Sequence, residues 1–140
     1  MKASTRTPDV SQGHMSGGRF IAETLKSYGV THVFFIESVL RQTLVELEAI
    51  GIRRVLTHSE AGAAYMADGY ARIARGPGVC MAQSVGAANL AAALQEPFLG
   101  GSSVLALTGK KLPGFQYRNA YQEIPHGPMF QAVTKFDATV

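Results

Sequence analysis

A glutamate stands at the point where a short apolar run passes into a helix of small residues. Glu60 follows the apolar run 53–57 and begins a helical segment that extends to about Ala74. Acidic side chains are favoured in the first turn of a helix, where the dipole and the free amides stabilise negative charge. The position at the start of a helix can therefore by itself explain why residue 60 is acidic. A catalytic interpretation requires Glu60 to be partly buried at the edge of a sheet, where its carboxyl group can share a proton with a ring nitrogen of a ligand.

Two later loops hold the other candidate residues. Ser84 and Gly86 belong to the small-residue loop 84–89, and Asn89 at its end either caps the next helix or contacts a cofactor. Gln122 and Glu123 lie in the last loop, a place where most proteins carry ordinary surface polar residues. The sequence lacks a dinucleotide fingerprint, a phosphate loop, a nucleophile elbow and a metal-binding Cys/His cluster. A plain nucleotide-binding domain is therefore the weakest interpretation.

Apolar positions at helical spacing alternate along the chain with short runs rich in β-branched and aromatic residues. Helices are expected over 17–28, 38–50, 60–74 and 90–98, and strands over 30–36, 53–57, 79–83 and 103–108. Ser38 is the expected cap of the second helix. The inner faces expected for the first two helices comprise Phe20, Ile21, Leu25 and Tyr28, and Leu40, Leu44, Val45 and Leu47. The segment 109–136 is expected to be a long loop with short helical pieces.

The predicted strands are short apolar runs without polar alternation, which is typical of strands buried on both faces of a parallel sheet. The predicted fold is therefore a three-layer α/β/α domain with a mostly parallel sheet. In such sheets ligands bind outside the carboxyl ends of the strands. The loops at those ends contain Glu37-Ser38, His58-Ser59-Glu60, residues 83–89 and Thr108-Gly109-Lys110, so these are expected to converge on one edge.

Length, composition and charge place the chain among soluble globular domains. It has 140 residues with 46% hydrophobic and 16% charged residues, a composition that suits one domain over 17–140 behind a disordered tail, 1–16. The net charge of +3 is spread along the chain without a basic patch, which argues against a nucleic-acid partner. Cys80 is the only cysteine and lies in an apolar run, so we expect a small buried side chain and a cytoplasmic protein. No apolar stretch approaches the ~20 residues that span a bilayer, so no membrane partner is expected.

The ordered motifs of the chain resemble the N-terminal pyrimidine-binding domain of the thiamine diphosphate enzymes related to acetolactate synthase. The resemblance covers about 17–140, and its central block is highly specific. The motifs are Tyr28-Gly29-Val30-Thr31-His32-Val33-Phe34, His58-Ser59-Glu60-Ala61-Gly62-Ala63-Ala64, Met66-Ala67-Asp68-Gly69-Tyr70-Ala71-Arg72, Gly78-Val79-Cys80, Ala87-Ala88-Asn89-Leu90, Leu107-Thr108-Gly109, Tyr121-Gln122-Glu123 and Val133-Thr134-Lys135.

This resemblance implies a Rossmann-like thiamine diphosphate-binding fold and a role for each candidate residue. In such enzymes the glutamate matching Glu60 hydrogen-bonds the aminopyrimidine N1′, which prepares the cofactor to attack a 2-keto acid. Ser84, Gly86 and Asn89 match the segment that lines the pyrimidine pocket, and Gln122 matches a residue on the substrate side. The small residues after Glu60 pack closely against a neighbour, and the resemblance implies that this neighbour is another subunit.

The resemblance further implies decarboxylation or carboligation of 2-keto acids, shared with other parts of an assembly. The diphosphate and its Mg²⁺ are held in this family by a separate domain with a Gly-Asp-Gly…Asn motif that these 140 residues lack. The middle and diphosphate-binding domains are thus expected on a partner subunit or in a homodimer, and the chain alone is expected to be inactive. Flavin (FAD) binding is left open.

Two departures from the family pattern bear on the substrate and on the fit of the cofactor, and the first of them supports an alternative, a non-catalytic binding or assembly module that retains the fold. Phe35, Glu37 and Ser38 stand where the family has glycines and a Pro-Gly, and their bulk and charge are expected to reshape the pocket. Ser84-Val85-Gly86 replaces the usual Gly-Pro-Gly.

Overall fold

Four parallel strands form the centre of the fold. The computed structural model describes residues 14–36 and 40–140. The sheet runs in the order β2-β1-β3-β4, and every described pair of neighbouring strands is parallel. Its strands are β1 His32–Phe35, β2 Arg53–Leu56, β3 Gly78–Gln83 and β4 Val104–Gly109. The predicted fold class is therefore confirmed.

Burial differs between the central and the edge strands. β1 and β3 are buried almost throughout, but β2 is partly open and its Leu56 is exposed. The prediction that β2 is a buried strand was wrong, because β2 is an edge strand with only one neighbour. Only Val55 and Leu56 of β2 are apolar, and so short an apolar stretch does not reveal this difference.

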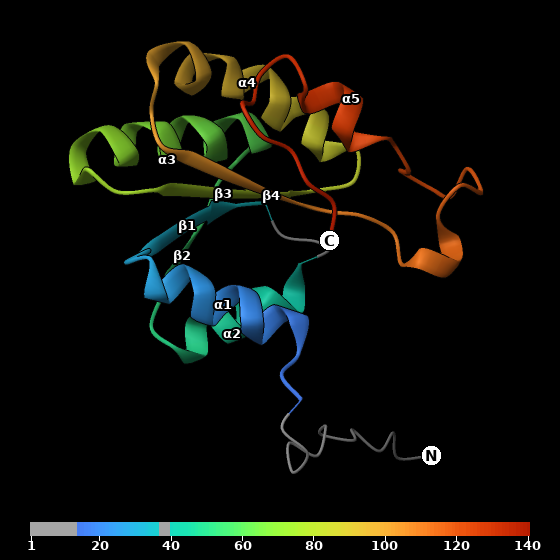
Figure 1. The fold of residues 1–140 in the computed structure, drawn as a ribbon, viewed down its shortest axis with the longest axis horizontal. Helices are drawn as coiled ribbons and strands as arrows, with labels where there is room; N and C mark the ends of the chain where they lie inside the picture. Colours follow the sequence, from blue (N-terminus) through green and yellow to red (C-terminus); the bar gives the residue numbers. More distant parts are fainter. Residues whose placement is uncertain (1–13, 37–39) are drawn as a thin grey trace.

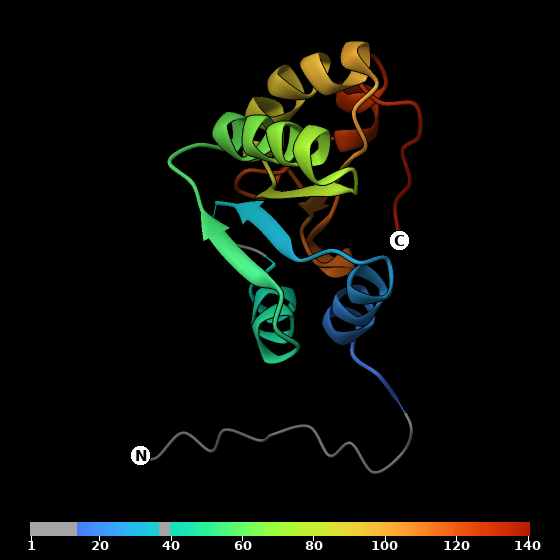
Figure 2. The ribbon, with the colours of Figure 1, turned by 90° about the vertical axis from the view of Figure 1, so that its left-hand side faces the viewer.

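Helices cover both faces of the sheet (Figure 1). The helices α1 Gly17–Ser27 and α2 Arg41–Ala49 lie on one face, and α3 Glu60–Ala74 and α4 Gly86–Gly100 lie on the other. Figure 2 shows the same layers from the side, with the short helix α5, His126–Phe130, beside α4. Each face has its own apolar core, one built around Leu47 and Val33 and the other around Leu90 and Cys80.

The inner faces of α1 and α2 are narrower than predicted. Leu25 of α1 and Leu44 and Leu47 of α2 are buried, as expected, whereas Phe20 and Tyr28 are exposed. Val45 is also exposed, because it lies about 100° round the helix from Leu44. Ser16 caps α1 by accepting a hydrogen bond from the Arg19 amide at 3.1 Å. The predicted cap Ser38 and its neighbour Glu37 lie outside the described residues.

The helix α3 has the predicted bounds, and its small residues are used inside this chain. Ser59 caps it by accepting a hydrogen bond from the Gly62 amide at 3.0 Å, and Arg75 ends it in the left-handed conformation. A Cβ at Gly78 of β3 would lie 2.0 Å from the carbonyl oxygen of Ala67, so α3 presses directly onto the sheet. The four buried alanines of this helix therefore pack within the chain, which corrects the expectation that they contact another subunit: Ala63, Ala64, Ala67 and Ala71.

The helix α4 is longer than predicted at both ends. It begins at Gly86 and ends at Gly100, so Asn89 is a residue of its first turn and not its cap. The segment after β4 is irregular, as predicted, apart from the 3₁₀ turn η1, Pro113–Phe115, and α5. None of the helices in the described part of the chain is both long and apolar enough to cross a membrane.

Candidate functional site

Glu60 lies at the carboxyl end of β2 with its side chain half-buried against the start of α4. Its Oε2 accepts a hydrogen bond from Nδ2 of Asn89 at 3.2 Å. Ser59 already satisfies the free amide of Gly62. The carboxylate of Glu60 is therefore directed toward α4, away from the amides of its own helix. This arrangement disfavours the explanation of Glu60 as a simple first-turn acid and meets the partial burial that a catalytic role requires.

Gly86 leaves the space that the Glu60 carboxylate occupies. A Cβ on Gly86 would lie 2.9 Å from Cδ of Glu60 and still closer to its Oε1. Any larger residue would push the carboxylate out of its position. Glu60, Gly86 and Asn89 thus form one contact group, as their sequence pattern predicts, although they come from two different helices.

Ser84 connects this contact group to the end of β3. It is buried, with a positive φ of 33°, and its amide donates to the carbonyl oxygen of Gly109 at 2.8 Å. The left-handed region is uncommon for a residue with a side chain, so its neighbours must hold this conformation. The turn at Ser84 places Gly86 beside Glu60 at the start of α4.

His126 holds the Ser84 turn from the other side. Its Nε2 lies 3.0 Å from the carbonyl oxygen of Ser84, and its Nδ1 lies 2.9 Å from Oγ1 of Thr108. A carbonyl oxygen can only accept, so Nε2 carries the proton and the neutral Nδ1 accepts from the Thr108 hydroxyl. Burial lowers the pKa of His126, and the positive charge of Lys110 acts in the same direction. His126 is therefore a neutral, doubly hydrogen-bonded support.

The sequence interpretation missed His126. It lies between Pro125 and Gly127 in an irregular segment, where no periodic pattern marks a buried side chain. Only the contact across 42 positions of the sequence with Ser84 shows its role.

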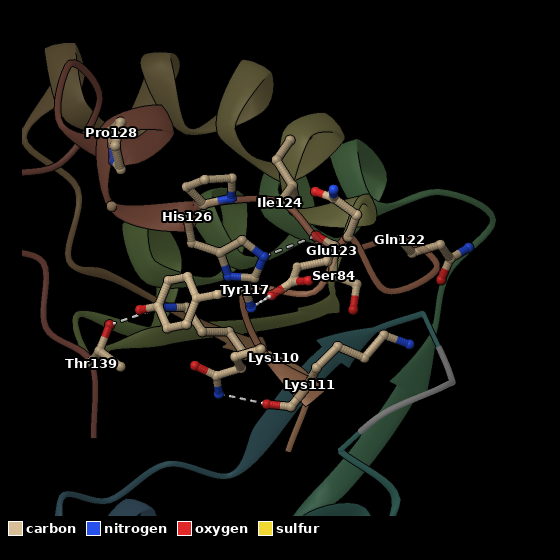
Figure 3. Close-up of a pocket in the computed structure, with 14 residues that line it drawn as sticks. Ser84, Lys110, Lys111, Tyr117, Gln122, Glu123, Ile124, His126, Pro128 and Thr139 are labelled. Atoms are coloured by element: carbon tan, nitrogen blue, oxygen red, sulfur yellow. Dashed lines mark hydrogen bonds between the residues drawn. The ribbon is translucent and has the colours of Figure 1, made fainter. Parts of the chain in front are cut away.

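A cavity of about 580 Å³ opens beside this turn (Figure 3). Ser84, Gln122 and His126 line it, together with residues that follow β4. Gln122 has a φ of 63°, and its Oε1 accepts from Nε2 of Gln83 at 3.3 Å. The cavity is large enough for a small organic ligand. Glu60 and Asn89 do not line it, so Ser84 and Gln122 belong to a neighbouring part of the same edge.

The loop that closes the cavity is folded around Glu123. Its carboxylate accepts from the backbone amides of Tyr117, of Arg118 at 3.3 Å and of Ala120 at 3.0 Å. These bonds lower the pKa of Glu123, with the bond from Tyr117 as the largest cause. Glu123 is therefore a structural residue, whose negative charge is stabilised by the loop amides and by the nearby Lys111.

The remaining candidates have simpler explanations. Burial raises the pKa of Cys80 to about 12, so this thiol is an inert core residue, as predicted. Phe35 packs in the core with side chains of α1 and α2, and the expectation that its bulk reshapes the pocket stays a prediction. In the described ranges 14–36 and 40–140, no group of three or more Cys, His, Asp or Glu residues could hold a metal ion.

Comparisons with known proteins show what the chain is similar to. Residues 15–129 match the family model described as thiamine pyrophosphate enzyme, N-terminal TPP binding domain. The chain is 34% identical to 2-hydroxyacyl-CoA lyase 2 of Danio rerio over 131 residues, which cover 92% of the chain and 21% of that protein. It is 30% identical to an acetolactate synthase of Bacillus subtilis over 126 residues, which cover 89% of this chain and 22% of that protein.

A solved structure shows the same fold. A thiamine diphosphate-dependent 4-hydroxybenzoylformate decarboxylase of Rhodococcus jostii superposes with a TM-score of 0.77 and 19% identity, covering 86% of this chain and 23% of that one. The chain spans about a fifth of the length of these relatives.

Proposed function

Because this chain belongs to the thiamine pyrophosphate enzymes, as their N-terminal TPP binding domain, we propose that Glu60 is its catalytic residue and binds the cofactor's pyrimidine ring. Thiamine pyrophosphate is the same compound as thiamine diphosphate. The observation that carries the proposal is the contact of the half-buried Glu60 carboxylate with the bare Cα of Gly86. Asn89 holds Oε2, and Oε1 has no hydrogen-bond partner among the described residues. A carboxylate oxygen held at the carboxyl edge of a parallel sheet suits a ring nitrogen of a flat ligand.

The residues present fit the pyrimidine half of the cofactor. Gly86 allows a close approach, Asn89 orients the carboxylate, and the buried Ser84 turn sets the position of Gly86. Bound thiamine diphosphate would supply the reactive carbon that takes up the keto carbon of a 2-keto acid. Glu60 would hold or release a proton at the ring nitrogen, and Gln122 would face the substrate.

The other components of the reaction are assigned to a partner. We propose that the diphosphate and Mg²⁺ are bound by a diphosphate-binding domain outside these 140 residues, in a homodimer or on a partner subunit. FAD remains a candidate second cofactor of that assembly. The reaction proposed for the assembly is decarboxylation or carboligation of a 2-keto acid, and a cytoplasmic location stays a prediction.

A titration of the chain with thiamine diphosphate tests the role of Glu60. We expect chemical-shift changes in ¹⁵N-labelled chain that centre on Glu60, Gly86 and Asn89. Glu60→Gln keeps the size of the side chain but cannot take part in the proton exchange, so it should weaken binding by about tenfold, the loss of one charge-assisted hydrogen bond. Glu96→Gln, on the exposed side of α4, is the matched control and should bind as the unmodified chain does.

Two results would contradict the assignment. One is equal binding by the two variants, and the other is a set of shift changes remote from Glu60. Complementation with a partner that carries the diphosphate domain extends the test, because Glu60→Gln should then abolish the reconstituted decarboxylase or carboligase activity.

A face for the partner is proposed on the outer side of α3. Tyr65, Met66 and Ile73 project from one side of this helix and are exposed. Exposed apolar side chains that gather on one helix face are typical of an interaction site. This apolar α3 face, and not the buried alanines, is the surface proposed to contact a second subunit.

A further inference from the structure

The cavity beside the Ser84 turn contains two lysines that form no ion pair with any described carboxylate. Lys110 and Lys111 follow β4 and line the cavity. Among the described residues of the lining, the only carboxylate is that of Glu123, which accepts hydrogen bonds from three backbone amides and attracts Lys111. His126 is neutral there, because burial lowers its pKa. The described lining therefore carries two positive charges, on Lys110 and Lys111, against the single negative charge of Glu123, and a net positive charge is left for an anionic ligand.

The two ammonium groups are held at different ends of the cavity. Nζ of Lys110 donates to Oγ1 of Thr139 at 3.1 Å, whereas Nζ of Lys111 lies 6.0 Å from the centre of the Tyr121 ring. Figure 3 shows the two side chains extending to opposite sides. A ligand with one anionic group can satisfy only one of them, whereas a ligand with anionic groups at both ends can satisfy both.

The Lys111 end adjoins the cofactor side of the site. Tyr121 precedes Gln122, whose amide is hydrogen-bonded to Gln83 at the carboxyl end of β3. Ser84 and Gly86 come directly after the end of β3 in the sequence, and Gly86 lies against the side chain of Glu60. The Lys110 end lies at Thr139, near the end of the chain, and is the distal end of the cavity.

Given the proposed function, on which this step rests, we infer that the cavity selects 2-keto acids that carry a second carboxylate. Lys111 binds the carboxylate next to the keto carbon, and Lys110 binds the carboxylate at the other end of the substrate. The cavity, at about 580 Å³, has room for such a short dicarboxylate. Thr139 holds Lys110 in position, so less conformational entropy is lost when the anion binds.

Two acids of equal chain length test this selectivity in the full chain. 2-Oxoglutarate has the second carboxylate, and 2-oxopentanoate has a methyl group in its place. In titrations followed by ¹⁵N chemical shifts at low salt, 2-oxoglutarate should bind about fivefold to tenfold more tightly, the effect of one charge-assisted contact. The difference should shrink as the salt concentration rises, because the groups are partly open to solvent.

Single substitutions assign the two ends. Lys110→Met should lower the affinity for 2-oxoglutarate to that of 2-oxopentanoate and leave the latter unchanged. Lys111→Met should weaken the binding of both acids by the same factor. Lys26→Met, on the exposed last turn of α1, is the matched control for a lost positive charge and should change neither affinity. Equal affinity of the two acids for the unmodified chain, or equal effects of Lys110→Met and Lys26→Met, would overturn the inference.

The same samples separate this inference from the proposed function. Lys110→Met should bind thiamine diphosphate as the unmodified chain does, because Lys110 lies away from Glu60. Selectivity for 2-oxoglutarate without any thiamine diphosphate binding would refute the proposed function alone. Binding of thiamine diphosphate that depends on Glu60, combined with no preference between the two acids, would refute only the dicarboxylate selectivity.

Discussion

At the scale of single residues, the site depends on side chains that hold others in place. Glu60 is oriented by Asn89 and accommodated by Gly86, and the position of Gly86 depends on the turn at Ser84. His126 is buried, at 4% exposed, and it fixes that turn although it lies outside every sequence motif of the site. A proton on His126 would place a charge where burial disfavours it.

The stability of the chain should therefore depend on His126 in mildly acidic solution. The folded-state pKa of His126 lies below its ordinary value of 6.5, with burial as the main cause, Lys110 acting alongside and Asp137 and the Ser84 carbonyl opposing. The unfolded chain thus binds the proton first as the pH falls, so the stabilisation is complete above about pH 6.5 and is lost below it. The free energy of unfolding from urea titrations should fall between pH 7.5 and pH 5.5, and His126→Asn should reduce this fall.

A matched control isolates this effect from other titrations. His58→Asn removes an exposed histidine and should leave the pH dependence as it is in the unmodified chain. If His126→Asn and His58→Asn gave the same slope as the unmodified chain, protonation of His126 would not be linked to folding.

At the scale of elements, local signals decide which parts are predictable from sequence. The helix α3 has the bounds that were predicted for it, because local signals set both ends: Ser59 caps its start in the structure, and the turn 75–78 follows its end. The start of α4 was predicted wrongly, because its N-cap Val85 makes no side-chain capping bond and Gly86 by itself favours a loop. Tertiary contact with Glu60 replaces the missing local signal. The exposure of β2 and the support by His126 depend on contacts between distant segments, which periodicity does not contain.

Substitution by alanine should change the stability in opposite directions at two glycines, Gly78 in β3 beneath α3 and Gly69 within α3. A Cβ at Gly78 would meet the carbonyl of Ala67 at 2.0 Å, so Gly78→Ala must push α3 off β3 and should cost about 3 kcal/mol of stability. Nothing lies within 4 Å of a Cβ at Gly69, so Gly69→Ala should stabilise the helix by about 0.5–1 kcal/mol. Urea unfolding followed by circular dichroism measures both. An equal effect of the two substitutions would mean that α3 does not pack this closely on the sheet.

At the scale of the whole molecule, the chain contains a pyrimidine half-site and an apolar surface beside it. The carboxyl ends of α3 and α4 lie together, because Arg72 bonds Asp68 at 2.9 Å and its Nη2 would lie 2.9 Å from a Cβ on Gly100. Asp68 is buried, and the bond from Arg72 is the largest cause of its lowered pKa. The two helices therefore pack side by side as one layer, and the apolar α3 face lies on its outside.

Association of two copies through the apolar α3 face should fail when a charge is placed on that face. Ile73 is 86% exposed, so Ile73→Glu should leave the fold of one copy intact. The carboxylate introduced by Ile73→Glu would be buried without a partner between the two copies, and this should raise the dissociation constant of the dimer by at least about tenfold. Sedimentation velocity over a concentration series measures this change. Val45→Glu, at a residue 61% exposed on the opposite face of the sheet, is the control and should associate like the unmodified chain. Equal weakening by both variants would show that net charge, and not the α3 surface, governs association.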